Sequence, residues 1–256
     1  MATILSSYAD GVLQLTMNRP EKKNAFNLVQ WNALKELLDE ALADSRVAVV
    51  VLTGAGADFS AGQDLTEMLS GGGDSGGEHP FQAAMKTLYT FDKPLLAAAR
   101  GVGVGFGATC LFHCDLVYVG ESVRLKLPFV SLGLVPEAAS SYMLQTVIGY
   151  QRAAELFFTA EWIDANKAVS SGIAAAKWPD EELLEATLEK AREIAQWPVG
   201  ALRATKRTLR APHLEAIWAA EKAEQEGMVQ QVGSAENIEA ITAFVEKRKP
   251  DFRKLS

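Results

Sequence analysis

The first 17 residues show the alternation of a β-hairpin. Apolar and polar positions alternate between residues 12 and 17, and the segments 4–8 and 12–17 flank the dipeptide Asp10-Gly11. An Asp-Gly pair between two such runs favours a tight turn. We therefore expect two antiparallel strands near the start of the sequence.

A helical period comes next, and then a buried strand. Apolar residues recur every three or four positions from Leu28 to Leu42, and Asn27 precedes the first of them as an expected helix cap. The continuous apolar run 47–52 predicts a strand that is covered on both faces. A strand, a helix and a strand in this order imply parallel pairing.

The same order repeats downstream. We expect strands at 95–99 and 116–119 with a short helix at 106–113 between them, and a helix at 137–148 after the apolar run 132–135. From residue 181 onward the pattern is helical, and we expect helices at 182–196, 200–209, 215–232 and 235–247. The sequence thus predicts an α/β core over residues 1–195 and a helical C-terminal region over residues 196–256.

Composition and charge limit the class of protein. The chain has 256 residues, of which 48% are hydrophobic and 22% charged, so it can bury a large core without disulfides or metals. Its formal net charge of −7 offers no overall positive field for nucleic acid or an anionic membrane, and we expect partners of neither kind. No apolar stretch is long enough to span a bilayer and no leader pattern opens the sequence, so we expect a cytoplasmic location.

Two local features have more than one interpretation. Cys110 and Cys114 lie four residues apart, but no second Cys or His pair would complete a metal site, so we expect buried reduced thiols. The stretch 70–77 reads SGGGDSGG, and glycine at this density has no side chains with which to pack. It is either a plain linker or a loop that becomes ordered over a ligand.

Three glycine-containing segments carry the candidate backbone chemistry: 60–65, 101–107 and 133–137. Each is expected where a strand gives way to a helix, and two helix N-termini that face each other could hold a developing oxyanion. The alternative is that the glycines only permit close packing of strand and helix. A dinucleotide fingerprint does not fit, because the third glycine of G-x-G-x-x-G would fall at Phe106.

Four blocks of sequence resemble one known family. They read NRPEKKNAFN (18–27), VVVLTGAGADFSAGQDL (49–65), KPLLAAARGVGVGFGATCLFHCDLVY (93–118) and LPFVSLGLVPE (127–137). In this order and spacing they resemble the crotonase, or enoyl-CoA hydratase/isomerase, superfamily. The resemblance implies an α/β fold with a crotonase-like spiral of β-β-α turns. It also implies that the C-terminal helical region forms a homotrimer or a dimer of trimers.

The resemblance further implies the substrate and the groups that hold it. The substrate would be an acyl-CoA thioester, CoA would enter as part of it, and no metal or redox cofactor would be needed. The backbone N–H groups of Gln63 and Phe106 would form an oxyanion hole. Further implied substrate-binding residues are Lys22, Lys23, Ala25, Ala61, Asp64 and Leu65. Without the resemblance, the two lysines would be interpreted as part of a solvated charge cluster.

The two glutamates with which hydratases of this family add water would fall at Thr109 and Phe129. Syn addition needs one group to activate the water and another to deliver a proton, and neither residue can do so as a carboxyl would. Glu137 remains, in an otherwise apolar stretch. It could stabilise the start of a helix, or it could be a base whose pKa is raised by burial and opposed by a helix N-terminus.

The segment LPFVSLGLVPEAASSY resembles the one that carries the single catalytic glutamate of Δ3,Δ2-enoyl-CoA isomerases. A 1,3-proton shift needs one base, so the chemistry and the resemblance both indicate Glu137. We therefore interpret the protein as an isomerase that converts 3-enoyl-CoA to trans-2-enoyl-CoA. The alternatives are a hydratase or another crotonase-type reaction, thioester hydrolysis included, and a non-catalytic acyl-CoA-binding module.

The remaining candidates are assigned structural roles. His113 lies in an apolar helix, and we expect it to be buried and hydrogen-bonded rather than a base. His79 and His213 stand beside prolines in expected loops. Asp64 is also expected to cap or begin a helix.

Overall fold

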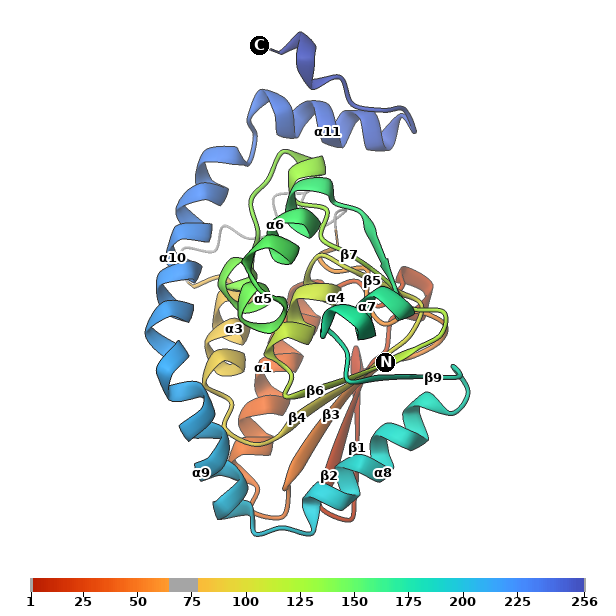
Figure 1. Ribbon diagram of the computed structural model, residues 1–256, viewed down its shortest axis with the longest axis vertical. Coiled ribbons are helices and arrows are strands. Elements are labelled where there is room, and N and C mark those ends of the chain that lie inside the picture. Colours follow the sequence, from red (N-terminus) through yellow and green to blue (C-terminus); the bar gives the residue numbers. More distant parts are fainter. Residues whose placement is uncertain (1, 65–77, 256) are drawn as a thin grey trace.

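The computed structural model describes residues 2–64 and 78–255, and the strands there form two sheets (Figure 1). The larger sheet has the strand order β1-β2-β3-β4-β6-β9. These strands are β1 (Ile4–Ala9), β2 (Val12–Met17), β3 (Val49–Gly54), β4 (Leu95–Ala99), β6 (Leu116–Gly120) and β9 (Ala176–Trp178). β1 and β2 pair antiparallel, and the other neighbours pair parallel. The expected hairpin and parallel pairing are confirmed.

The smaller sheet consists of β5 (Val102–Val104), β7 (Arg124–Lys126) and β8 (Trp162–Asp164). From β4 to β7 the chain alternates between the two sheets, and this winding is the spiral that the resemblance implies. The short strands of the smaller sheet, and β9, were not predicted. Three residues are too few to establish a period.

Helices cover both faces of the central strands, which explains why β3 and β4 are continuous apolar runs. α1 (Leu28–Ala43) and α3 (Pro80–Thr90) pack against each other on one side, and α8 (Leu183–Ala195) contacts β3 and β4 on the other. Val50 and Leu52 belong to the core cluster on the α1 side, whereas Val49 and Val51 pack with α8. The side chain of Asn27 caps α1 and accepts a hydrogen bond from the Gln30 N–H at 2.9 Å, as expected.

The C-terminal helices are α9 (Val199–Arg210), α10 (Leu214–Gln231) and α11 (Ala235–Val245), close to their predicted bounds. Figure 1 shows α10 running along one flank of the molecule, where it packs against α5 (Ser140–Ile148). The division of the chain at residue 195 stays a prediction. Within residues 2–64 and 78–255, no helix combines the length and apolarity needed to cross a bilayer.

The structure corrects two expectations. The helix expected from Glu137 begins at Ser140, because Ala138 and Ala139 both adopt positive φ, at 60° and 51°. The segment 133–137 follows a short 3-10 helix (Val130–Leu132) rather than a strand. The sequence also missed three helices: α3, α6 (Tyr150–Thr159) and α7 (Ala165–Ser171). The glycine-rich stretch 70–77 lies outside the described residues.

Candidate active site

The blocks 18–27 and 49–64 lie against each other at the site. The Ala61 N–H donates to the Lys23 carbonyl at 2.8 Å, and the Phe26 N–H donates to the Gly62 carbonyl at 2.7 Å. Asn24, buried and at φ 55°, fixes this contact because its amide donates to the carbonyls of Ala55 and Asp58. The loop that ends in Gln63 is therefore held from two sides.

Gln63 is fixed by its side chain, which leaves its backbone N–H available. Its Oε1 accepts a hydrogen bond from the indole Nε1 of the fully buried Trp31 at 2.9 Å. The neighbouring Asp64 N–H donates to the Phe26 carbonyl at 2.8 Å. No hydrogen bond within residues 2–64 and 78–255 uses the Gln63 backbone N–H. This is what an oxyanion donor requires.

Phe106 opens the short helix α4 (Phe106–Thr109), and Gly105 turns the chain into it. Gly105 has φ 53° and ψ −122°, a conformation that a residue with a Cβ rarely adopts. A Cβ on Gly62 would lie 3.2 Å from the Phe106 backbone nitrogen, so the Gln63 loop and this helix start are adjacent. A Cβ on Gly107 would lie 2.0 Å from the Ser60 carbonyl oxygen, so close packing, the alternative explanation, also applies.

The Glu137 carboxylate lies at the same place. Its Oε1 is 3.7 Å from where a Cβ of Gly105 would stand, and the backbone N–H of the next residue, Phe106, is close enough to lower the pKa of this carboxylate. Burial, followed by the charges of Glu224 and Glu221, raises the pKa of Glu137 to about 7. The opposing effect comes from the Phe106 N–H, not from the N-terminus of α5, because α5 begins three residues further on.

Thr109 and Phe129, where the resemblance would place the two hydratase glutamates, are both buried and carry no acidic group. Thr109 ends α4 and is fully buried. Phe129 is 4% exposed, and its ring centroid lies 6.3 Å from that of Phe157. Neither position offers a carboxyl to activate or protonate water.

The structure brings some, but not all, of the other predicted binding residues together. Lys22 and Lys23 are exposed, and Lys23 lies 3.6 Å from the carboxylate of Asp58. Ala25 is buried beside them. Asp64 forms an ion pair with Arg19 at 3.0 Å, and Ala61 joins the 18–27 block through its N–H. Leu65, and any helix that Asp64 would begin, lie outside the described residues. Their roles toward substrate stay predictions.

His113 has the structural role expected of it. It is 1% exposed, its Nε2 lies 2.7 Å from the Ala138 carbonyl, and burial lowers its pKa to about 3. The neutral ring must therefore donate from Nε2. His79 and His213 are not in plain loops: His79 caps α3, and His213 lies in a short 3-10 helix. Cys110 is buried and free, and Cys114 is free and half-buried.

Sequence reasoning missed two buried acids behind Glu137. Glu221 and Glu224 lie on α10, are 8% and 6% exposed, and share its inner face with Ile217. Their positions four and seven residues after Ile217, on the same helix face, are the available signal. Charged residues at such positions usually face solvent, so the pattern alone does not reveal them.

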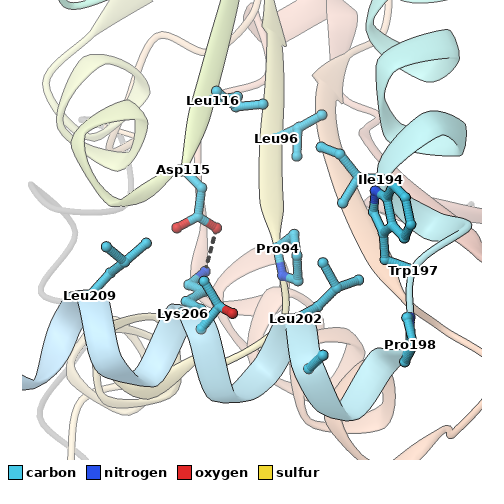
Figure 2. A pocket seen from close by; sticks show the side chains of 12 residues that line it. Pro94, Leu96, Asp115, Leu116, Ile194, Trp197, Pro198, Leu202, Lys206 and Leu209 are labelled. Carbon is cyan, nitrogen blue, oxygen red and sulfur yellow. Dashed lines mark ion pairs between the residues drawn. The ribbon is translucent and has the colours of Figure 1, made fainter.

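A hollow elsewhere in the molecule is separate from this site. A cavity of about 400 Å³ lies between α9 and the first residues of β4 and β6, lined mainly by apolar side chains, with an ion pair between Lys206 and Asp115 at 2.7 Å (Figure 2). It lies at the amino ends of these strands. The turn that leads to Phe106 follows the carboxyl end of β4.

Comparison with known proteins identifies the family. The model of the family "Enoyl-CoA hydratase/isomerase" matches residues 7–254. The chain is 32% identical over 253 residues to the 2,3-dehydroadipyl-CoA hydratase of Escherichia coli (strain K12), with 99% of both chains covered. It is 31% identical over 252 residues to enoyl-CoA delta isomerase 2 of Rattus norvegicus. That match covers 96% of this chain and 64% of the rat protein.

A solved structure agrees with this result. The crystal structure of an enoyl-CoA hydratase/isomerase from Pseudoalteromonas atlantica T6c has a TM-score of 0.93 at 34% identity, and the match covers 98% of this chain and 99% of that one. The chain belongs to the enoyl-CoA hydratase/isomerase family, and the predicted crotonase fold is confirmed.

Proposed function

We propose that this enzyme converts 3-enoyl-CoA to trans-2-enoyl-CoA with Glu137 as its single acid-base group. The observation that carries the proposal is the position of the Glu137 carboxylate beside the Gly105–Phe106 turn, at a site where positions 109 and 129 hold Thr and Phe. One carboxylate beside an oxyanion donor suits a proton shift. Two would be needed for the addition of water.

In the proposed reaction, Glu137 removes a proton from C2 of the substrate and returns it at C4. The intermediate dienolate carries negative charge on the thioester oxygen, which the N–H groups of Gln63 and Phe106 would stabilise. The Phe106 N–H would have to pass from the Glu137 carboxylate to the thioester oxygen. When the Phe106 N–H turns to the thioester oxygen, the carboxylate loses this favourable interaction and becomes a stronger base.

A pKa of about 7 fits both halves of this cycle. The carboxylate must accept a proton and then give it back, and a general acid-base group does so best when its pKa lies near the working pH. An ordinary glutamate, with a pKa near 4.3, would accept the proton less readily.

The CoA portion would be bound by the 18–27 block, where Lys22 and Lys23 offer exposed positive charge and Ala25 lies against them. Ala61, Asp64 and Leu65 would be further substrate-binding residues, as the resemblance implies. We also propose a homotrimer or a dimer of trimers. Exposed large apolar residues on the outer helices support it, among them Tyr150, Phe158 and Val229.

The isomerase and hydratase proposals are separated by one spectroscopic experiment. The purified protein is mixed with 3-enoyl-CoA, and the ultraviolet absorbance of the conjugated thioester is followed; a parallel sample with trans-2-enoyl-CoA measures the loss of that absorbance. The proposal expects a rise in the first sample and negligible loss in the second. Loss in the second sample alone would favour a hydratase, as the similarity to the 2,3-dehydroadipyl-CoA hydratase allows. Binding of both esters without change would favour a non-catalytic module.

A further inference from the structure

The turn that carries Glu137 has an unusual backbone for its residues. Ala138 and Ala139 are consecutive, both are buried, and both have positive φ. Each alanine in this region costs about 1–2 kcal/mol relative to the right-handed conformation. Such a conformation persists only where the surrounding structure imposes it. Something outside the turn must therefore hold it.

Two side chains from distant parts of the chain do so. One oxygen of the Glu224 carboxylate accepts the Ala139 N–H at 2.7 Å, and the other accepts the Ser141 N–H at 2.8 Å. On the opposite side, the His113 ring donates to the Ala138 carbonyl at 2.7 Å. These hydrogen bonds fix the Ala138 carbonyl and the Ala139 N–H, directly after Glu137.

We propose that Glu224 is a positioning residue for Glu137: its carboxylate clamps the Ala139 and Ser141 N–H groups, and so holds the turn that presents Glu137 to the Phe106 N–H. This inference rests on the proposed function. It adds a residue of the C-terminal helix α10 to the machinery, 87 positions away from the base in the sequence.

Glu224 has a neighbour that serves as a matched control. Glu221 lies one turn earlier on the same helix face and is equally buried, but its carboxylate accepts hydrogen bonds from the Tyr89 hydroxyl and the Gln225 amide. It does not contact the turn in any hydrogen bond among the described residues. Replacing either glutamate by glutamine removes one carboxyl group near Glu137, whereas only the change at 224 disturbs the clamp.

The groups that face Glu137 come from three elements. Glu221 and Glu224 approach from α10, Tyr89 from α3, and Cys110 from the 3-10 helix that also carries His113. Burial raises the pKa values of Tyr89 and Cys110, so both are neutral near pH 7. Burial raises the pKa of Glu224 to about 7 as well, so a titration near neutral pH belongs to Glu137 together with Glu224.

The test compares Glu224→Gln with Glu221→Gln in three measurements. Glutamine offers one acceptor oxygen where the carboxylate offers two, and its NH2 group would face a backbone N–H. We expect Glu224→Gln to lower kcat at least tenfold with KM within about threefold, since the groups that bind the substrate are untouched. The acid limb of kcat/KM should move to lower pH in both variants, because each removes a carboxylate whose charge raises the pKa of Glu137, so kcat is the measurement that separates them. Glu221→Gln should keep kcat within about threefold.

The third measurement does not depend on activity. Amide hydrogen exchange at Ala139 and Ser141 should become at least tenfold faster in Glu224→Gln and should stay unchanged in Glu221→Gln. If wild-type protein fails to isomerise 3-enoyl-CoA, the proposed function fails, and this exchange measurement still decides whether Glu224 holds the turn.

Rescue distinguishes positioning from general destabilisation. Ala139→Gly relieves the cost of positive φ, so adding it to Glu224→Gln should restore kcat at least threefold. The proposal is overturned if Glu224→Gln keeps kcat within twofold of wild type. It is also overturned if Glu221→Gln loses as much kcat as Glu224→Gln.

Discussion

Two turns meet at the site, and they reach left-handed backbone in different ways. The turn 101–106 has positive φ at Gly101 and Gly105, where the absence of a Cβ makes such angles cheap. The turn 137–139 has positive φ at two alanines and relies on Glu224 and His113 to hold them. One turn is encoded locally, and the other is imposed by contacts from distant segments.

The two turns also supply different kinds of group to the proposed reaction. The glycine turn supplies a backbone N–H, which needs only the correct backbone conformation. The alanine turn supplies a side chain whose basicity depends on burial and on neighbouring charge, and both come from tertiary packing. Substitutions in the two turns should therefore fail in different ways.

The largest effect is expected from the reactive group of the alanine turn. Glu137→Gln is nearly isosteric but cannot accept the proton, so kcat should fall by about 10² or more while acyl-CoA binding persists. Single-turnover rates and acyl-CoA titration measure the two quantities. Rates within a few-fold of wild type would remove Glu137 from the mechanism.

The glycine turn should be nearly as sensitive to a single methyl group. In Gly105→Ala the added Cβ has room, 3.7 Å from the Glu137 Oε1, but φ 53° with ψ −122° is unfavourable for alanine, so the Phe106 N–H should turn away. Loss of one oxyanion donor typically lowers kcat by about 10² to 10³.

Gly172→Ala is the matched control for this change. Gly172 also has positive φ, at 93°, and a Cβ there would meet the Val147 carbonyl oxygen at 3.7 Å, outside the site. It should lose stability without losing activity. Equal activity in the two alanine variants would show that the Phe106 N–H is not an oxyanion donor.

A smaller effect on rate is expected where only a side chain is removed. Gln63→Ala keeps the backbone N–H, so kcat should stay within about tenfold of wild type. It leaves the buried Trp31 indole without its acceptor, which should lower the free energy of unfolding by about 1–3 kcal/mol. Denaturant unfolding and steady-state kinetics provide both numbers. A folded Gln63→Ala variant that is inactive would mean that the side-chain amide takes part in the reaction.

The smallest effect should come from the reverse exchange in the alanine turn. Ala139→Gly removes a conformational cost of about 1 kcal/mol, because glycine adopts positive φ easily, but it also loses about 0.8 kcal/mol from the burial of the methyl group. The free energy of unfolding should therefore change by less than about 0.5 kcal/mol. Activity should stay within about threefold, because Glu224 still accepts its N–H. A tenfold loss would mean that the alanine methyl itself packs the site.

These two turns also show how far the sequence alone can be interpreted. The hairpin, the parallel strands 95–99 and 116–119 and the C-terminal helices follow from local patterns, and the structure confirms them. The glycines around Phe106 are visible in the same way. Strands of three residues and the helix α3 lack a sufficient local signal.

The alanine turn was beyond such a prediction. Nothing in the sequence around Ala138 and Ala139 indicates positive φ, and the expected helix from Glu137 was therefore wrong. The partners that hold the turn are 25 and 85 residues away. The direction of the Glu137 pKa also depended on packing, because the sequence could not decide between burial and a helix N-terminus.

The pH dependence of kcat/KM for 3-enoyl-CoA tests the central claim most directly. Glu137 must be ionised to accept the proton, and burial raises its pKa, so the enzyme should lose activity as the pH falls through the folded value. The account predicts an acid limb with a midpoint near pH 7, below which the rate falls about tenfold per pH unit. A midpoint below about pH 5, near the pKa of an ordinary glutamate, would contradict it.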